Sequence, residues 1–168
     1  MRRTRLAFCL LIAAAAVALP LTGCGGDDAK KTEQGTQLNQ GGDRKGAENT
    51  VRDYLRALIA KDGAAACSKF TPEYQRAVLE KNEAFARKEN AKTCADLITR
   101  ITRVSRSVTF EGQPLNARTV DRLKLIVTLR QGGEEQNATV TGQQGLQRYE
   151  LVTNDGKWFI TEVVQGGR

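Results

Sequence analysis

Apolar residues follow two different periods in the part of the chain after residue 46. Up to about Val104 they recur three or four positions apart, which is typical of amphipathic helices. After Ser107 they alternate with polar residues, which indicates strands. Helices first and strands afterwards predict an α+β domain, in which the helices segregate to one side of an antiparallel sheet.

Capping and breaking residues divide the helical half. One helix is predicted from Ala47 to Ala60, because Asp62-Gly63 stops the pattern, and a short helical piece at 64–70 follows. Thr71 as N-cap with Pro72 at the first helical position begins the next helix, and Thr93 begins the last. The positions expected to face the core are Val51, Tyr54, Leu55, Leu58, Ile59, Tyr74, Val78, Leu79, Phe85, Leu97, Ile98, Ile101 and Val104.

The strand half is predicted to be an antiparallel meander. It starts with a short strand at 107–112 and a long strand at 118–131, in which Leu123, Leu125, Val127 and Leu129 share one face. Gly132-Gly133 turns the chain, and Asp155-Gly156 is suited to a two-residue hairpin loop with positive φ. That loop predicts three cross-strand pairs: Trp158 with Thr153, Ile160 with Leu151, and Glu162 with Tyr149.

The first 23 residues are unlike the rest. Arg2, Arg3 and Arg5 precede an unbroken apolar run from Leu6 to Leu19, which is the layout of a secretory signal peptide. The run has about 14 residues and is shorter than the roughly 20 that span a bilayer as a helix. A cleaved signal is therefore favoured over a retained membrane anchor.

The end of this segment, Leu21-Thr22-Gly23-Cys24, resembles the lipobox of bacterial lipoproteins. The resemblance implies that Cys24 receives a diacylglyceryl thioether, that cleavage falls before it, and that further acyl chains such as palmitate complete the anchor. It places the mature protein outside the cytoplasm, bound to a membrane of the cell envelope. The alternative is a plain signal peptide that happens to end near a cysteine.

Residues 24–46 are predicted to be a disordered tether. They include one leucine and no aromatic residue among many Gly, Gln, Asp and Lys residues, so they cannot bury enough apolar surface to offset the entropy of ordering. A flexible coil of this length holds a domain ~25 Å from its anchor on average. The folded domain is expected to occupy residues 47–165.

The cysteines and the net charge indicate a disulfide and argue against metal and nucleic-acid binding. Cys9 leaves with the signal and Cys24 is acylated, so Cys67 and Cys94 remain and are expected to form a disulfide; two free thiols are the alternative. The chain has no histidine and no CxxC, so only two soft ligands exist and a metal site is not expected. No cofactor is expected either. Without the three signal arginines, the chain has 23 basic and 19 acidic side chains, a net charge of +4. A charge this small does not indicate nucleic-acid binding.

The helices, the sheet and the closing stretch Asp155-Gly156-Lys157-Trp158 with Ile160 resemble the nuclear-transport-factor-2-like superfamily, also called cystatin-like or SnoaL-like. The resemblance implies a curved sheet that forms a cone-like roll around the helices, often with a pocket. Members include isomerases, cyclases, dehydratases and non-catalytic binding domains, so the fold does not choose a function. Homodimers are common in the superfamily, and the resemblance allows one here.

Three residues could supply chemistry to such a cone. Asp121 is in phase with Leu123 and Leu125, and Glu162 is in phase with Trp158 and is expected to face Tyr149. A carboxylate in an apolar interior can act as an acid or a base. The candidate catalytic residues are therefore Asp121, Glu162 and Tyr149, and the candidate pocket residues are Trp158, Tyr149 and Asp121.

These observations favour a lipid-anchored, non-enzymatic module that binds a small apolar ligand or an envelope protein. The alternative is a small pocket enzyme, isomerase-, cyclase- or dehydratase-like, that uses Asp121 or Glu162. A purely structural envelope protein is a third hypothesis. The sequence contains no recognisable catalytic motif, and no residue pattern in it identifies a ligand.

Overall fold

The computed structural model describes residues 44–132 and 135–166. The predicted signal at 1–23, Cys24 and the predicted tether up to residue 43 lie outside the described residues. The helices are α1 (Arg44–Ile59), α2 (Gly63–Cys67), α3 (Pro72–Lys81), α4 (Glu83–Lys88), α5 (Cys94–Val104) and α6 (Ala117–Asp121). The strands are β1 (Thr109–Phe110), β2 (Gln113–Pro114), β3 (Leu125–Gly132), β4 (Glu135–Gly142), β5 (Gln147–Asn154) and β6 (Lys157–Gln165).

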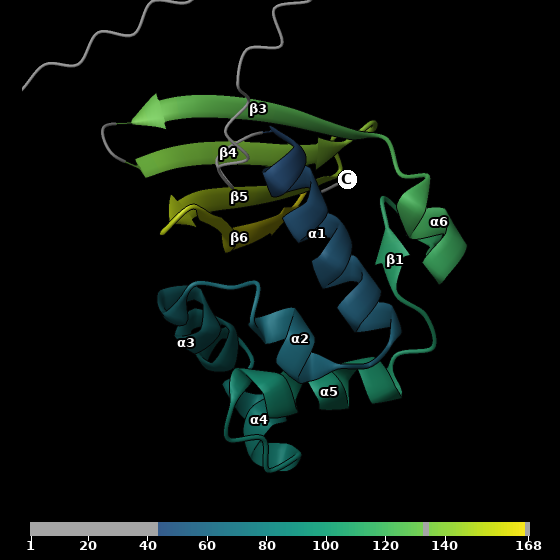
Figure 1. Ribbon diagram of the computed structural model, residues 1–168. Coiled ribbons are helices and arrows are strands. Elements are labelled where there is room, and N and C mark those ends of the chain that lie inside the picture. The colour runs from purple at the N-terminus through teal and green to yellow at the C-terminus, as the bar shows by residue number, and fades with distance from the viewer. Residues whose placement is uncertain (1–43, 133–134, 167–168) are drawn as a thin grey trace, which may run out of the picture. The chain divides into compact units, whose positions relative to one another are not determined.

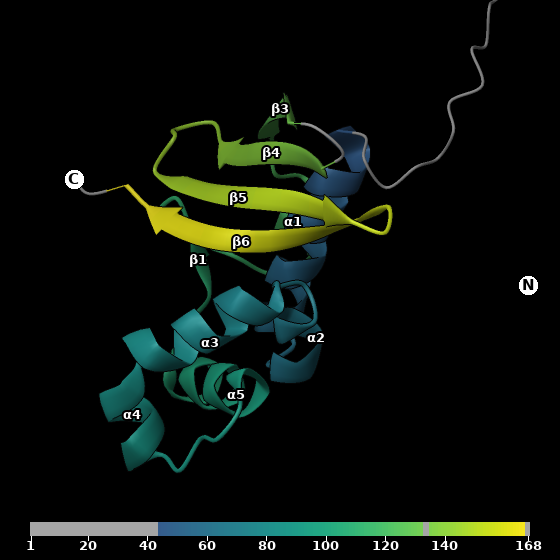
Figure 2. The same cartoon turned by 90° about the vertical axis from the view of Figure 1, so that its left-hand side faces the viewer.

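The described domain has the predicted α+β class. Strands β3, β4, β5 and β6 form an antiparallel sheet in that order, and β1 pairs with β2 in a separate two-stranded ribbon. Helix α1 lies across one face of the sheet, and α2 to α5 gather beyond the β6 edge (Figure 1). Figure 2 shows the same division from the side, with α1 behind the sheet and α3, α4 and α5 below β6.

The main core lies between α1 and the covered face of the sheet. Alternate residues of each strand point into it, as the period of two predicts. Leu123, Leu125, Val127 and Leu129 pack at its margin, as expected from the sequence. The largest fully buried side chains are Tyr149, Leu55, Leu97, Leu151, Ile160, Val51, Val120 and Val140.

Two of the predicted helix starts, at Thr71 and Thr93, are confirmed by their capping hydrogen bonds. The side chain of Thr71 accepts a hydrogen bond from the backbone N–H of Tyr74, with Pro72 at the first helical position. The side chain of Thr93 accepts one from Asp96. Helix α1 begins three residues earlier than predicted, at Arg44. Val104 was expected on the apolar face of α5 but is 65 % exposed, because it is the last residue of that helix.

The predicted disulfide is present. Cys67 ends α2, Cys94 begins α5, and their sulfurs are bonded with the Cα atoms 6.1 Å apart. Both residues are buried. The bridge therefore joins the short second helix to the start of the fifth, as the sequence predicted.

The last hairpin has the predicted turn but a different register further along. Asp155 and Gly156 have φ of 48° and 72°, so both adopt the left-handed conformation that a two-residue loop of this kind needs. Trp158 pairs with Thr153 and Ile160 with Leu151, as expected. A bulge then inserts Thr161, so that Val163, rather than Glu162, lies opposite Tyr149.

The long strand predicted at 118–131 is wrong over its first half. Residues 117–121 form α6, and the strand begins only at Leu125. The side chain of Asn116 accepts hydrogen bonds from the backbone N–H groups of Arg118 and Thr119, and the Thr119 hydroxyl accepts one from Asn116 N–H. This capping box outweighs the β-branched residues Thr119 and Val120, which favour a strand by propensity.

Candidate functional site

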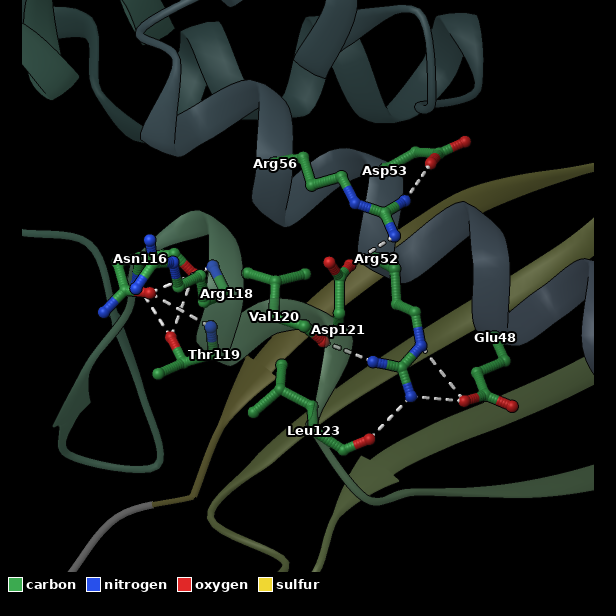
Figure 3. Close-up of polar contacts among 10 residues, drawn as sticks. All are labelled: Glu48, Arg52, Asp53, Arg56, Asn116, Arg118, Thr119, Val120, Asp121 and Leu123. Atoms are coloured by element: carbon green, nitrogen blue, oxygen red, sulfur yellow. Dashed lines mark hydrogen bonds and ion pairs between the residues drawn. The ribbon is translucent and has the colours of Figure 1, made fainter.

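Asp121 does not point into the fold. It is the last residue of α6, its side chain is 60 % exposed, and its Oδ1 accepts a hydrogen bond of 2.6 Å from Arg56 Nη2 (Figure 3). Arg56 also binds Asp53 Oδ1 at 2.7 Å. The expected inward orientation required a strand at residue 121, and the helix turns this carboxylate to the surface instead.

The neighbouring Arg52 fastens α6 and the start of β3 to α1. Its guanidinium donates hydrogen bonds to the carbonyl oxygens of Val120 and Leu123, the latter at 2.6 Å, and pairs with Glu48 at 2.5 Å (Figure 3). The Arg52 side chain is only 12 % exposed. Because its donors satisfy carbonyl groups at the end of a helix, this polar cluster has a structural role.

Glu162 also lies on the surface. The bulge places it opposite Glu150 on the face of the sheet that α1 does not cover. Glu150 is bound by Arg148 Nε at 2.9 Å and by the Thr139 hydroxyl at 2.7 Å. The expected pairing of Glu162 with Tyr149 is therefore wrong, because one additional residue in β6 reverses the side that the following residues face.

Tyr149 is fully buried, and its hydroxyl has no hydrogen-bond partner among the described residues. Its ring stacks on Phe110 with centroids 6.4 Å apart and meets Tyr54 edge-on at 6.0 Å. Burial raises the pKa of Tyr149 well above its usual value, and Tyr54 and Tyr74 add to that shift. This side chain belongs to the core, and Val163 rather than Glu162 lies opposite it in the sheet.

The three candidate pocket residues are not brought together. Trp158 is buried at the hairpin end of β6, and the Leu151–Ile160 pair separates it from Tyr149 along the sheet. A hollow of about 280 Å³ beside Trp158 is lined by Lys69, Lys157 and residues of α1, among others, and includes neither Tyr149 nor Asp121. Since Asp121 and Glu162 are both exposed, neither carboxylate lies in the apolar environment that the enzyme alternative requires.

A larger groove lies where the segment before α3 passes the outer side of β6. It has a volume of about 800 Å³. One wall is a cross-strand row on the uncovered face of the sheet, in which Asn137 lies beside Val152 and Val152 beside Phe159. The other described residues that line it are Ser68, Phe70, Thr71, Pro72, Glu73, Tyr74, Gln75, Ala77, Thr153, Asn154 and Thr161.

Hydrogen bonds from the backbone and from two side chains join the walls of this groove. Ile160 N–H donates to Lys69 O at 2.7 Å, and Thr71 N–H donates to Ile160 O at 3.1 Å, so the segment before α3 pairs with the edge of β6. Tyr74 then accepts a hydrogen bond of 3.0 Å from Val163 N–H through its hydroxyl. Gln75 Nε2 donates to Cys67 O at 2.9 Å. The walls are thereby held at fixed positions before any ligand binds.

Little in the sequence indicates this groove. The cross-strand row in its sheet wall occupies outward-facing positions of three strands, and only the apolar Val152 and Phe159 in that row are unusual for a solvent-facing surface. The opposite wall comes from residues about 80 positions earlier, brought there by the pairing of Phe70 with Ile160. No local spacing pattern encodes that contact.

The described residues contain no group of three or more His, Cys, Asp or Glu side chains that could hold a metal ion. None of their helices has the length and apolar character needed to cross a membrane.

The chain was compared with protein-family models, with curated proteins and with solved structures, and nothing matched in any of the three comparisons.

Proposed function

We propose that this protein is an exported, lipid-anchored module of the bacterial cell envelope that binds a ligand or partner in the groove between α3 and β6. Support for the anchor comes from Leu21-Thr22-Gly23-Cys24 after an apolar leader. The disulfide between Cys67 and Cys94 is consistent with an oxidising compartment. Acylation of Cys24 by two or three chains would hold the protein stably, since a single chain is marginal.

The observation that carries the binding role is the groove itself. Its volume of about 800 Å³ is within the range of small-molecule sites, and several side chains in its walls are fixed by hydrogen bonds. Glu73 is the one ionisable carboxylate among its described lining residues, and it pairs with Arg76 at 3.3 Å on the surface. This lining favours recognition over acid–base catalysis, which needs positioned titratable groups.

We further propose that the domain is related to the nuclear-transport-factor-2-like superfamily. Helices that precede an antiparallel meander, and a closing hairpin with Asp155-Gly156-Lys157-Trp158, support this relationship. The bulge at Thr161 is the kind of feature that bends a strand, and it supports the curved, cone-like sheet expected of that superfamily.

Intact-mass measurement of the protein extracted from its native membrane tests the anchor. The expected mass begins at Cys24, includes acyl chains, and gains two hydrogens on reduction. An unacylated mass, or one that retains residues 1–23, would contradict the proposed anchor without affecting the groove.

Photo-crosslinking in intact cells tests the groove. A benzoylphenylalanine residue replaces Thr161, which lines the groove, or Thr128, an exposed threonine on β3 that does not. Light-dependent adducts are expected at position 161 and not at position 128. Equal adducts at both positions, or none at either, would refute binding in the groove.

A further inference from the structure

We infer that the groove takes a neutral, hydroxyl-rich ligand, namely a saccharide chain. This inference rests on the proposed binding function and specifies its ligand. It follows from the charge of the lining, from the polar groups left free there, and from the way in which the neighbouring strand edge is already paired.

The charge of the lining disfavours anionic ligands. No lysine or arginine is among the described residues that line the groove, and Glu73 is its one charged side chain. Arg130 lies directly opposite Asn137 on β3 but outside the lining. Among the described lining residues, a phosphate, a sulfate or a nucleic acid would therefore find no lysine or arginine, the side chains that normally bind such groups.

Two amide side chains remain available for hydrogen bonding. Asn137 and Asn154 line the groove, are exposed, and make no side-chain hydrogen bond with any other described residue. Each amide can donate two hydrogen bonds and accept two, which matches hydroxyl groups that both donate and accept. The half-buried ring of Phe159 lies in the same row, one strand beyond Val152, and offers an apolar surface for the C–H face of a sugar ring.

An extended peptide fits less well. Peptides commonly bind a sheet by adding a strand to an exposed edge, where backbone hydrogen bonds supply affinity. At this groove the β6 edge is already occupied, because Lys69 and Thr71 bond Ile160 and the Tyr74 hydroxyl bonds Val163. The groove thus offers side chains rather than a free backbone edge.

The test measures binding of the acylated full-length protein, in a detergent without a sugar headgroup, to immobilised hexasaccharides. The panel contains neutral chains of glucose, mannose, galactose, arabinose and N-acetylglucosamine, together with a sulfated glycan and uncharged hexapeptides. We expect retention on at least one neutral saccharide. Asn137→Ala and Asn154→Ala should each weaken that binding by about tenfold, the loss of one hydrogen bond at the strong end of the usual range.

Asn49→Ala is the matched control, because Asn49 is an exposed asparagine on α1 that does not line the groove. It should leave the affinity unchanged. The inference is overturned if no neutral saccharide is retained, if only the sulfated glycan or the peptides are retained, or if all three asparagine variants bind alike. If the saccharide-binding test fails but adducts form at position 161 in cells, the saccharide ligand is refuted and the groove remains a binding site. Failure together with a lack of those adducts refutes the proposed function itself.

Discussion

At the scale of single residues, Tyr149 combines full burial with a hydroxyl that has no hydrogen-bond partner in the described part of the chain. An unpaired polar group inside a protein costs free energy, because it loses its hydrogen bond to water and gains none in return. The ring itself is well packed between Phe110 and Tyr54. The ring therefore stabilises the folded state, whereas the unpaired hydroxyl destabilises it.

Tyr149→Phe is expected to raise the free energy of unfolding by about 1 kcal/mol, because it removes the unpaired hydroxyl and keeps the ring. Urea denaturation with an unchanged slope is the measurement. Tyr74→Phe is the control, since the Tyr74 hydroxyl accepts a hydrogen bond from Val163 N–H and its loss should destabilise the protein. A destabilised Tyr149→Phe variant would show that the hydroxyl is paired in solution.

The three tyrosines predict a loss of stability at alkaline pH. Burial raises the pKa of Tyr54, of Tyr149 and of Tyr74 in the folded state. A group whose pKa is higher in the folded than in the unfolded state contributes its full stabilisation at pH values below its unfolded pKa, which is about 10 for tyrosine. That stabilisation is lost as the pH rises toward the folded pKa. The melting temperature should therefore fall above pH 10.

Thermal unfolding between pH 8 and pH 11, with tyrosinate absorbance recorded in parallel, checks this dependence. Tyr149→Phe should make the alkaline fall shallower. A melting temperature that stays constant to pH 11, or tyrosinate signals that appear near pH 10 in the folded protein, would show that these hydroxyls reach solvent.

At the scale of elements, the contact between α2 and α5 depends on a glycine. A Cβ atom on Gly63 would lie 2.1 Å from Ala95 O and 2.8 Å from Thr99 N, both of which are backbone atoms. Gly63 N–H also donates to the Thr99 hydroxyl at 3.2 Å. The two helices can approach this closely because the position has no side chain.

Gly63→Ala is expected to destabilise the protein by about 2–3 kcal/mol, because the backbone of α5 has to move away. Chemical denaturation measures the change. Gly145→Ala is the comparison: it places alanine at a φ of +67° but with no atom within 4 Å of the new Cβ, and it should cost about 1 kcal/mol. If Gly63→Ala costs no more than Gly145→Ala, the close helix contact is not rigid.

The disulfide joins the same two helices covalently. It links residues 27 positions apart, and closing a loop of that length stabilises a fold by ~3.6 kcal/mol through the entropy of the unfolded chain. The double variant Cys67→Ala/Cys94→Ala should lose about that amount, measured by denaturation against the oxidised protein. Reduced wild-type protein should behave like the double variant. Equal stability of oxidised and reduced protein would contradict the prediction.

At the scale of the whole molecule, the main core extends from the first helix to the last strand. Most buried residues from Ala47 to Ile160 belong to this cluster, and Ala86, Ala91 and Leu97 form a second, smaller one. Arg52 adds polar links from α1 to α6 and to the start of β3. A chain that begins at Arg44 therefore contains the elements that pack on one another.

A fragment of residues 44–166 is accordingly expected to fold alone, with the far-ultraviolet circular dichroism of an α+β protein and a cooperative melting transition. Its denaturation midpoint should match that of the full-length protein in detergent. An unfolded fragment, or a broad transition, would show that residues before Arg44 contribute to the fold.

Local chemistry in the sequence was sufficient for many features. The caps at Thr71 and Thr93 and the turn at Asp155-Gly156 were predicted because the groups that interact are neighbours along the chain. The pairing of Cys67 with Cys94 followed because these two cysteines remain once Cys9 is assigned to the leader and Cys24 to the lipobox. Helix α6 was also encoded locally, by the capping box of Asn116 and Thr119, but strand-favouring residues concealed it.

Features that depend on distant contacts were not predictable in this way. Glu162 is in phase with Ile160 in the sequence, yet the bulge at Thr161 turns it outward. In the fold, Val163 faces Tyr149 while its N–H meets the hydroxyl of Tyr74, from a helix 89 positions earlier. The bulge at Thr161 sets the register in which both contacts are made.

The sequence by itself thus determined the division into helices followed by strands, the starts of α3 and α5 and most of the apolar faces, because periodicity and capping act within a few residues. Tertiary structure decided the surface position of Glu162, the burial of Tyr149 and the groove between α3 and β6. Those outcomes depend on which segments lie side by side, and Lys69, Phe70 and Thr71 meet Ile160 only after the chain has folded.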